Sequence, residues 1–361
     1  MKKIAFLTAA VLLLTLALTG CGGGKSLTLN VYNWGEYISD GSEDSFDTVR
    51  EFERWYEENY GQRVSVNYTT FASNEDMYNK ISSGAVSYDV IIPSDYMIAR
   101  MANEGLLQKL NFENIPNYQY IDESFKGLYY DPQNAYTVPY TYGIVGVIYD
   151  ANVVDAADVG GWELLWNEKY KGRILQFNNS RDAFGTAMYK LGLDVNSADK
   201  AVWDQAYQAL LAQRPSVYSY VMDEIFNMME SGEAAIGAYY AGDYFTMKDA
   251  QAENVDLRFY YPEKTNFFVD AMCIPSCCQN KEAAETFINF LCKPEIAGGN
   301  MDYLGYGTPE TAAKEFMDPE VVASEVAYPS EETLSKGTSF LFLPASVNQR
   351  MEELWLQAKT D

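Results

Sequence analysis

The sequence predicts an α/β protein of two lobes, each built from discontinuous parts of the chain and joined to the other by hinge strands. From residue 27 onward, segments with the alternation or apolar run of a strand are interleaved with segments of helical period. This order is typical of parallel sheets with crossover helices. Two strand-like segments, 137–150 and 267–274, separate one α/β pattern from the other. Because the chain crosses twice, we expect a hinge and a cleft.

The first lobe begins with a strand in which Leu27, Leu29 and Val31 alternate with polar residues. Apolar residues then recur at helical spacing over 46–56, and Gly61 is expected to end that helix. The other elements expected here are a strand over 63–69, a helix starting at Ser73, a buried strand over 89–93 and a helix over 94–105. We expect lobe 1 to comprise residues 27–138 and 268–320.

The segment 137–150 is rich in strand formers but contains Pro139, Gly143 and Gly146, which suits a crossing between lobes better than the centre of a sheet. We expect lobe 2 to comprise residues 139–267 and 321–361. Its predicted helices cover 162–167, 184–191, 200–213, 222–229 and 243–254, and its predicted strands cover 173–177, 234–240 and 256–261.

The N-terminus has the pattern of a secretory signal. Lys2 and Lys3 precede an apolar run over 4–18, which is shorter than the ~20 residues that span a bilayer. Leu-Thr-Gly-Cys at 18–21 resembles the bacterial lipobox, so we expect a signal peptide over 1–20, lipid attachment at Cys21 and a tether over 21–26. The mature protein is then expected on the outer face of the cell membrane, or in the periplasm of a Gram-negative cell.

Composition excludes several functions. The formal charge of −25 disfavours nucleic acid and anionic membrane as ligands and favours cations. The absence of histidine removes Ser-His-Asp and Cys-His nucleophile activation and the commonest metal ligand. We expect no catalytic residue, no metal site and no cofactor.

Four cysteines follow Cys21, and the sequence leaves three roles open for them. In an extracytoplasmic protein they could form two disulfides, in one of three connectivities, or a thiolate metal site. However, Cys273 lies in an apolar strand-like run and Cys292 lies on the apolar face of a helix, so we favour small core residues.

Candidate binding residues follow the predicted strands, where ligands sit in α/β sheets. Trp34 and Tyr37 follow the first strand, whereas Glu36 between them is expected to be a structural or surface acid. The candidates after later strands are Ser94 and Tyr96, Asn179 and Asp182, and Tyr240; Tyr306 lies in a tight loop between two glycines.

Asp270 is the most informative acid because its neighbours in the FFVDAM run are all apolar. An unpaired buried carboxylate is costly, so Asp270 either has an internal partner or awaits a cationic ligand. Aromatic side chains combined with two or three acids suit a linear polyamine, whose ammonium groups pair with carboxylates and whose methylenes pack on rings.

These residues occur in short sequence motifs that resemble those of the polyamine-binding proteins of spermidine/putrescine ABC importers. The matching motifs are YNWGEY, ASNEDMYNKI, YDVIIPSDY, VPYTYG, WNEKYKGRI, FFVDAM, INFLCKPE and LGYGTPE, and the similarity runs from Leu29 to about Lys359. The resemblance implies the two-lobed periplasmic-binding-protein fold of type II, closing on its ligand. It also implies a monomer that delivers its ligand to separate ABC permease subunits.

Carried over by position, the resemblance implies an amine contact at Asp270 and a second acid at Asp182. It implies that Trp34, Tyr37 and Tyr96 line the side of the first lobe, and that Tyr240, Phe268 and Tyr306 form aromatic walls. The chain departs from the family at Asn179, where relatives have an acid, and at Tyr240 and Phe268, where relatives have tryptophan. The lost acid leaves the choice between spermidine and putrescine open.

The sequence therefore predicts a receptor for spermidine, putrescine or both. One alternative is an oligosaccharide-binding transport receptor, because aromatic platforms also stack on sugars. The other alternative is a glycosidase with a carboxylate pair, although no feature of the sequence sets two acids at catalytic separation.

Overall fold

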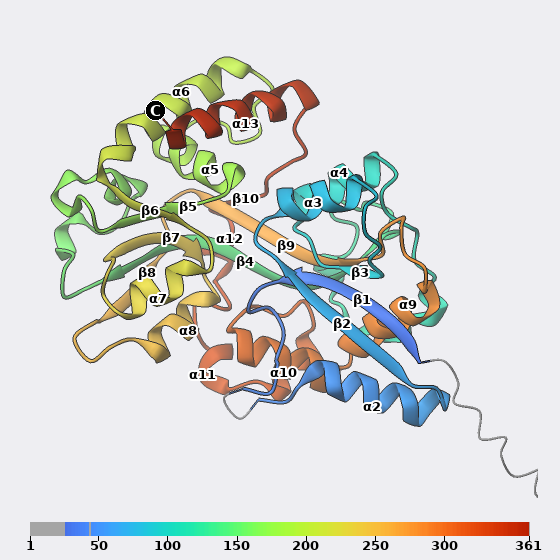
Figure 1. Cartoon of the computed structure of the whole chain (residues 1–361). Coiled ribbons are helices and arrows are strands. Elements are labelled where there is room, and N and C mark those ends of the chain that lie inside the picture. The colour runs from blue at the N-terminus through green and yellow to red at the C-terminus, as the bar shows by residue number, and fades with distance from the viewer. Residues whose placement is uncertain (1–25, 43–44, 361) are drawn as a thin grey trace, which may run out of the picture.

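A computed structural model describes residues 26–42 and 45–360 of the 361-residue chain. The expected signal peptide, the lipid-attachment residue Cys21 and all but the last residue of the expected tether lie outside the described residues. Two sets of strands with their helices are connected through a pair of long strands in the middle of the molecule (Figure 1).

The first α/β unit has the predicted order of elements. The helix α2 begins after Asp47, whose side chain accepts the N–H of Arg50 at 3.0 Å, and ends at Gly61, which has a left-handed backbone (φ 65°). The predicted helix start at Ser73 is also confirmed, because its Oγ accepts the N–H of Asp76 at 3.1 Å. The elements are β1 (Leu27–Trp34), α2 (Thr48–Tyr60), β2 (Val64–Phe71), α3 (Asn74–Ser82), β3 (Val90–Ile91) and α4 (Asp95–Asn103).

The second α/β unit differs from the prediction at three places. The helix expected from residue 184 begins earlier, because Asn179 caps it by accepting the N–H of Asp182 at 2.8 Å. The predicted helix over 162–167 is a 3₁₀ helix, Trp162–Trp166, and a strand, β6, was not predicted. The elements are β4 (Thr137–Asp150), β5 (Ile174–Phe177), α5 (Ser180–Leu191), α6 (Lys200–Gln213), β6 (Val217–Val221), α7 (Glu224–Glu230), β7 (Ile236–Tyr240), α8 (Asp243–Ala250) and β8 (Leu257–Tyr260).

The chain then returns through β9 and ends in helices that cover both units. These elements are β9 (Thr265–Cys273), α9 (Lys281–Leu291), α10 (Pro294–Leu304), α11 (Pro319–Val322), α12 (Glu331–Leu334), β10 (Gly337–Thr338) and α13 (Ala345–Thr360). The helices α9 and α10 lie beside α2, whereas α13 packs against α6 and α5 at the opposite end of the molecule (Figure 1). Short 3₁₀ helices occupy several of the connections.

The strands form one mixed sheet in the order β2-β1-β3-β9-β4-β7-β5-β6, with β8 and β10 attached at its side. Parallel pairing within each unit is as predicted: β1 pairs with β2 and β3, and β5 pairs with β6 and β7. In the middle, β9 and β4 pair antiparallel with each other and with the strands on either side. The sheet is therefore parallel at its two ends and antiparallel in the middle.

The strand β4 is a crossing strand, as its sequence indicates, but it also occupies the centre of the sheet. Its residues 137–144 pair with β9, whereas residues 145–150 pair with β7 and β8. Its Pro139 coincides with a register shift between residues 139 and 141, where the missing N–H costs no regular ladder bond. One continuous strand thus belongs to both lobes of a two-lobed fold.

The apolar core lies on both faces of the sheet. In β1, Leu29 and Val31 pack in the larger buried cluster, while Tyr32 packs in a second cluster beneath α3 and α4. Cys273 and Cys292 are buried in these clusters, which confirms them as core residues. All four cysteines of the described chain are free thiols.

Candidate functional site

A cavity lies where β1, β9 and the start of α4 meet the turns after β6 and β7. Its volume is about 470 Å³, which includes the open solvent at its mouth. Its lining combines rings with acids. The lining residues are Trp34, Gly35, Glu36, Tyr37, Ser94, Met222, Asp223, Phe226, Tyr239, Tyr240, Asp243, Phe268, Asp270 and Tyr306.

The turn after β1 is held so that Tyr37 points into the protein. The buried side chain of Asn33 donates to the carbonyl of Tyr37 at 3.3 Å, and the hydroxyl of Tyr140 donates to the same oxygen at 2.9 Å. Glu36 has a left-handed backbone (φ 44°), which reverses the chain at this point. Trp34 ends β1, and its Nε1 has no hydrogen-bond partner within the described part of the chain. The predicted aromatic pair is therefore built on a fixed turn.

Asp270 lies on β9 and is 3% exposed. Its Oδ2 accepts the hydroxyl of Tyr37 at 2.7 Å, but its Oδ1 has no hydrogen-bond partner among residues 26–42 and 45–360. The backbone of Asp270 pairs with Ser94, so the start of α4 lies directly beside this carboxyl group. Burial raises the pKa of Asp270 from 3.8 to about 6, against the opposing effect of the Tyr37 and Ser94 hydroxyls. Half of this carboxylate therefore remains free to accept a donor from a ligand.

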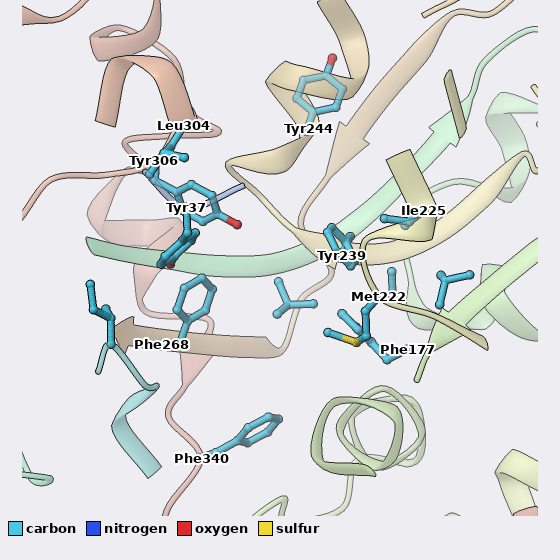
Figure 2. Close-up of a cluster of buried hydrophobic side chains, with 14 of the residues drawn as sticks. Tyr37, Phe177, Met222, Ile225, Tyr239, Tyr244, Phe268, Leu304, Tyr306 and Phe340 are labelled. Atoms are coloured by element: carbon cyan, nitrogen blue, oxygen red, sulfur yellow. The ribbon is translucent and has the colours of Figure 1, made fainter. Parts of the chain in front are cut away.

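Aromatic rings form a continuous wall next to Asp270. The ring centroid of Tyr306 lies 5.5 Å from that of Tyr37 and 6.4 Å from that of Phe268, and the centroid of Phe268 lies 5.5 Å from that of Tyr240. Figure 2 shows Tyr37, Tyr306 and Phe268 grouped together. The ring of Tyr306 also packs on Gly242, where a Cβ would be 2.2 Å from the ring. Rings of this kind pack on apolar chains and attract cations.

Seven of the ten predicted binding residues line the cavity, and the other three form a layer behind it. The Oδ2 atom of Asp182 accepts two hydrogen bonds, from the hydroxyl of Tyr240 at 2.8 Å and from the side-chain amide of Asn179 at 2.7 Å. Tyr96 donates to Oε1 of Glu75 at 2.9 Å, on the α3 side. Asp182 therefore reaches the cavity through Tyr240, and Asn179 also donates to the sulfur of Met222, another lining residue, at 3.6 Å.

Three acids that are not among these ten residues also line the cavity. Glu36 is exposed at its edge, and Asp223 follows β6, with its Oδ2 against Gly35 of the opposite unit. Asp243 begins α8, and burial is the main cause that raises its pKa well above 3.8, with smaller contributions from Asp223 and Glu36. The sequence does contain a signal for Asp243, because this acid follows a predicted strand just as Tyr240 does.

The charged side chains of the cavity lining favour a cation over an anion. The lining given above contains four carboxyl side chains and no lysine or arginine. Burial raises the pKa of Tyr37, Tyr240 and Tyr306 well above 10, so these hydroxyls stay neutral and act as hydrogen-bond donors to carboxylates. Within the described residues, no group of three or more His, Cys, Asp or Glu side chains has the geometry to hold a metal ion.

Comparison with known proteins identifies the family of the chain. Residues 48–330 match the family model of the bacterial extracellular solute-binding proteins. The chain belongs to this family. A related solute-binding protein is the spermidine/putrescine-binding periplasmic protein of Salmonella typhimurium, which is 31% identical over 341 residues that cover 93% of each chain. The putrescine-binding periplasmic protein PotF of Escherichia coli is 26% identical, with 94% of each chain covered.

Solved structures of solute-binding proteins have the same fold. A putative spermidine/putrescine ABC transporter from Listeria monocytogenes superposes with a TM-score of 0.83 at 32% identity, covering 93% of this chain and 99% of that one. The substrate-binding protein PotD of Streptococcus pneumoniae, in complex with calcium and HEPES, gives 0.74 at 34% identity, with 92% and 99% covered. The Salmonella relative is a periplasmic binding protein and the pneumococcal one is the substrate-binding protein of an ABC transporter, so the chain is a solute-binding protein and not an enzyme. No helix of the described chain is long and apolar enough to cross a membrane.

Proposed function

We propose that this solute-binding protein captures a linear polyamine, spermidine or putrescine or both, and delivers it to the permease of an ABC importer. The observation that carries the proposal is Asp270: it is buried beside a wall of rings, and one of its oxygens has no hydrogen-bond partner within the described residues. An ammonium group satisfies that oxygen by a charge-assisted hydrogen bond. The names of the relatives agree with this ligand class.

The proposed ligand contacts follow from the geometry of the cavity. The first ammonium pairs with Asp270 and Tyr37, while the methylene chain packs against Phe268 and the tyrosine wall. The predicted contacts Trp34, Ser94, Tyr240 and Tyr306 complete the lining. Tyr96, Asn179 and Asp182 stay proposed as contacts of a longer ligand that displaces Tyr240.

Ligand length is the finer part of this proposal. In the structure the side-chain amide of Asn179 donates a hydrogen bond to Asp182, the only acid of these two residues. This hydrogen bond partly satisfies the Asp182 carboxylate. We infer that replacing Asn179 with aspartate adds a second charge and shifts preference toward spermidine. An unchanged ratio of spermidine to putrescine affinity in Asn179→Asp would contradict this account of selectivity.

The anchoring, localisation and oligomeric state form a separate part of the proposal. We infer a monomer held on the outer face of the membrane by a lipid on Cys21, or a periplasmic location in a Gram-negative cell. Metabolic labelling with a radioactive fatty acid tests this directly. Labelled wild-type protein and unlabelled Cys21→Ala are the expected results, while equal labelling of both contradicts lipidation at Cys21.

Calorimetric titration of the purified protein tests the proposed ligand. We expect saturable heat with putrescine or spermidine, and none with maltodextrins. Binding of a maltodextrin without a response to either polyamine would favour the oligosaccharide alternative. No heat with any polyamine at concentrations far above micromolar would remove the proposal.

A further inference from the structure

The two α/β units touch each other where α8 meets α10. The helix α8 follows β7 of the second unit, whereas α10 lies with α2 beside the first unit, and the two helices are in contact (Figure 1). Each helix has a glycine at the end that takes part in this contact. Gly242 directly precedes α8, and Gly305 directly follows α10.

Each of these glycines is covered by an aromatic side chain of the opposite unit. The ring of Tyr306 lies on Gly242, where a Cβ would be 2.2 Å from Cδ2 and 2.4 Å from Cγ of the ring. The side chain of Phe245 lies on Gly305, where a Cβ would be 2.8 Å from Cδ2 of the ring and 2.9 Å from the carbonyl oxygen of Gly242. Carbon atoms cannot approach other atoms so closely, so the two backbones meet in a way that only glycine permits.

Phe245 packs into neither the core nor the cavity. Its neighbour Tyr244 is buried in the larger apolar cluster, whereas Phe245 is only partly buried and belongs to neither of the two apolar clusters of the described chain. It is also not among the residues that line the cavity. The ring of Phe245 therefore serves the contact between the units.

Both sides of this contact are attached to the crossing strand β4. Tyr142 donates its N–H to the carbonyl of Gly307 at 3.2 Å, next to Tyr306, and Ala241 donates its N–H to the carbonyl of Ile144 at 3.1 Å, next to Gly242. The strand changes partners at residue 145. A contact beside this crossing point fixes the angle at which the two units meet.

We propose that Phe245 is a positioning residue for ligand capture: by packing on Gly305 it stabilises the arrangement in which the two units enclose the cavity, without touching the ligand. This inference rests on the proposed function, because it concerns closure on the same polyamine. The measured affinity is the intrinsic affinity of the closed form multiplied by the fraction of the protein that adopts this form. Phe245 acts on that fraction and not on the choice between ligands.

Replacing Phe245 with alanine tests the proposal. Phe245→Ala should weaken putrescine and spermidine binding by the same factor, about twofold to tenfold, which is the usual effect of one aromatic contact. Because the ligand leaves only after the units separate, most of the change should be faster dissociation. Phe245→Leu keeps part of the apolar contact and should give an intermediate result. Calorimetry measures the two affinities, and stopped-flow fluorescence measures the dissociation rates.

The matched control is Phe259→Ala, which removes a similar contact inside one unit. Phe259 is also partly buried, and its ring also lies on a glycine, because a Cβ on Gly146 would be 2.1 Å from its Cζ. Here both residues belong to paired strands of the second unit, β8 and β4, and neither lines the cavity. This control should lower the Tm of the ligand-free protein and leave both affinities and both dissociation rates unchanged.

Three results would overturn the inference. The first is a Phe245→Ala protein that binds and releases both polyamines as the wild type does. The second is a loss confined to one polyamine, which would make Phe245 a ligand contact, and the third is an equal loss in Phe259→Ala, which would make the effect one of stability. If Phe245→Ala does not fold, Phe245→Leu decides alone, and wild-type affinities and rates in that variant overturn the inference. Absence of any binding heat in the wild type removes the proposed function itself, and this inference with it.

Discussion

Replacing Asp270 with asparagine should change ligand affinity and protein stability in opposite directions. The carboxylate of Asp270 is buried, and within the described residues only one of its two oxygens accepts a hydrogen bond, from the hydroxyl of Tyr37 at 2.7 Å. Without ligand this charge therefore destabilises the fold, and with ligand it pairs with an ammonium group. Asp270→Asn removes both the destabilising charge and the partner of the ammonium group.

The stability term follows from the pKa of Asp270. Burial raises that pKa from 3.8 in the unfolded chain to about 6, so the ionised group destabilises the folded protein by about 3 kcal/mol at pH 7.5. This destabilisation is absent below pH 3.8, grows as the pH rises from 3.8 to about 6, and is complete above that pKa. Weakening of the Tyr37 hydrogen bond offsets about 1 kcal/mol of the gain. We expect the ligand-free variant to have a Tm a few degrees higher than the wild type at pH 7.5 and no advantage at pH 4.

The expected loss of ligand affinity in Asp270→Asn is larger than the gain in stability. Truncating one partner of a buried charge pair costs about 2–5 kcal/mol of binding free energy, which corresponds to a Kd roughly 30-fold to several thousand-fold higher. Calorimetry with putrescine and spermidine measures the loss, and thermal unfolding with and without ligand measures the stability. The ligand-induced rise in Tm should nearly disappear in the variant.

Asp131→Asn is the matched control, because Asp131 is also buried but is fully paired. Its Oδ2 accepts the backbone N–H groups of Tyr136 at 2.8 Å and Thr137 at 3.0 Å, and its Oδ1 accepts that of Ala135 at 2.9 Å. This control should lower stability by about 1–3 kcal/mol and leave ligand affinity unchanged. An Asp270→Asn variant that loses stability, or that binds polyamine as well as the wild type does, would refute the reasoning.

Three further outcomes follow from the same geometry. Burial, and then the charge of Glu352, raises the pKa of Glu75 from 4.5 to about 7, so the wild-type Tm should fall as the pH rises from about 4.5 to 7 and Glu75→Gln should flatten that profile; an identical profile in the variant would contradict it. In Gly242→Ala the new Cβ meets the ring of Tyr306, so we expect weaker polyamine binding by calorimetry, and unchanged affinity would show that this ring is dispensable. Because the four described cysteines are free, a reducing agent should leave the Tm unchanged; a clear fall would indicate a stabilising disulfide.

The sequence was most informative where a residue conflicts with its neighbours. Asp270 could be predicted as a special acid because the residues around it are apolar and the strand is buried. Tyr306 was identified because glycines flank it, and the left-handed Gly305 (φ 73°) does present its ring to Gly242. In both cases a local irregularity marked the residue.

The residues that were missed show no such conflict. Asp95 is an acid in the first turn of a helix, which is where acids are ordinarily favoured, so its burial could not be read from the chain. Asp223 was missed because β6 was not predicted, and its position against Gly35 depends on how two distant units meet. Contacts between units carry no local sequence signal.

The strand β4 holds three parts of the cavity wall through three consecutive residues. Tyr140 donates to the carbonyl of Tyr37, Thr141 lies opposite Asp270 in register, and Tyr142 donates its N–H to the carbonyl of Gly307, the residue after Tyr306. These contacts all precede residue 145, where the strand changes partners. A hinge motion at residue 145 would leave this half of the binding site unchanged. This half is therefore preorganised and loses little conformational entropy when the ligand binds. Discrimination between ligands should then depend mainly on the half of the site in the other lobe, which has to close on the preorganised half in each binding event.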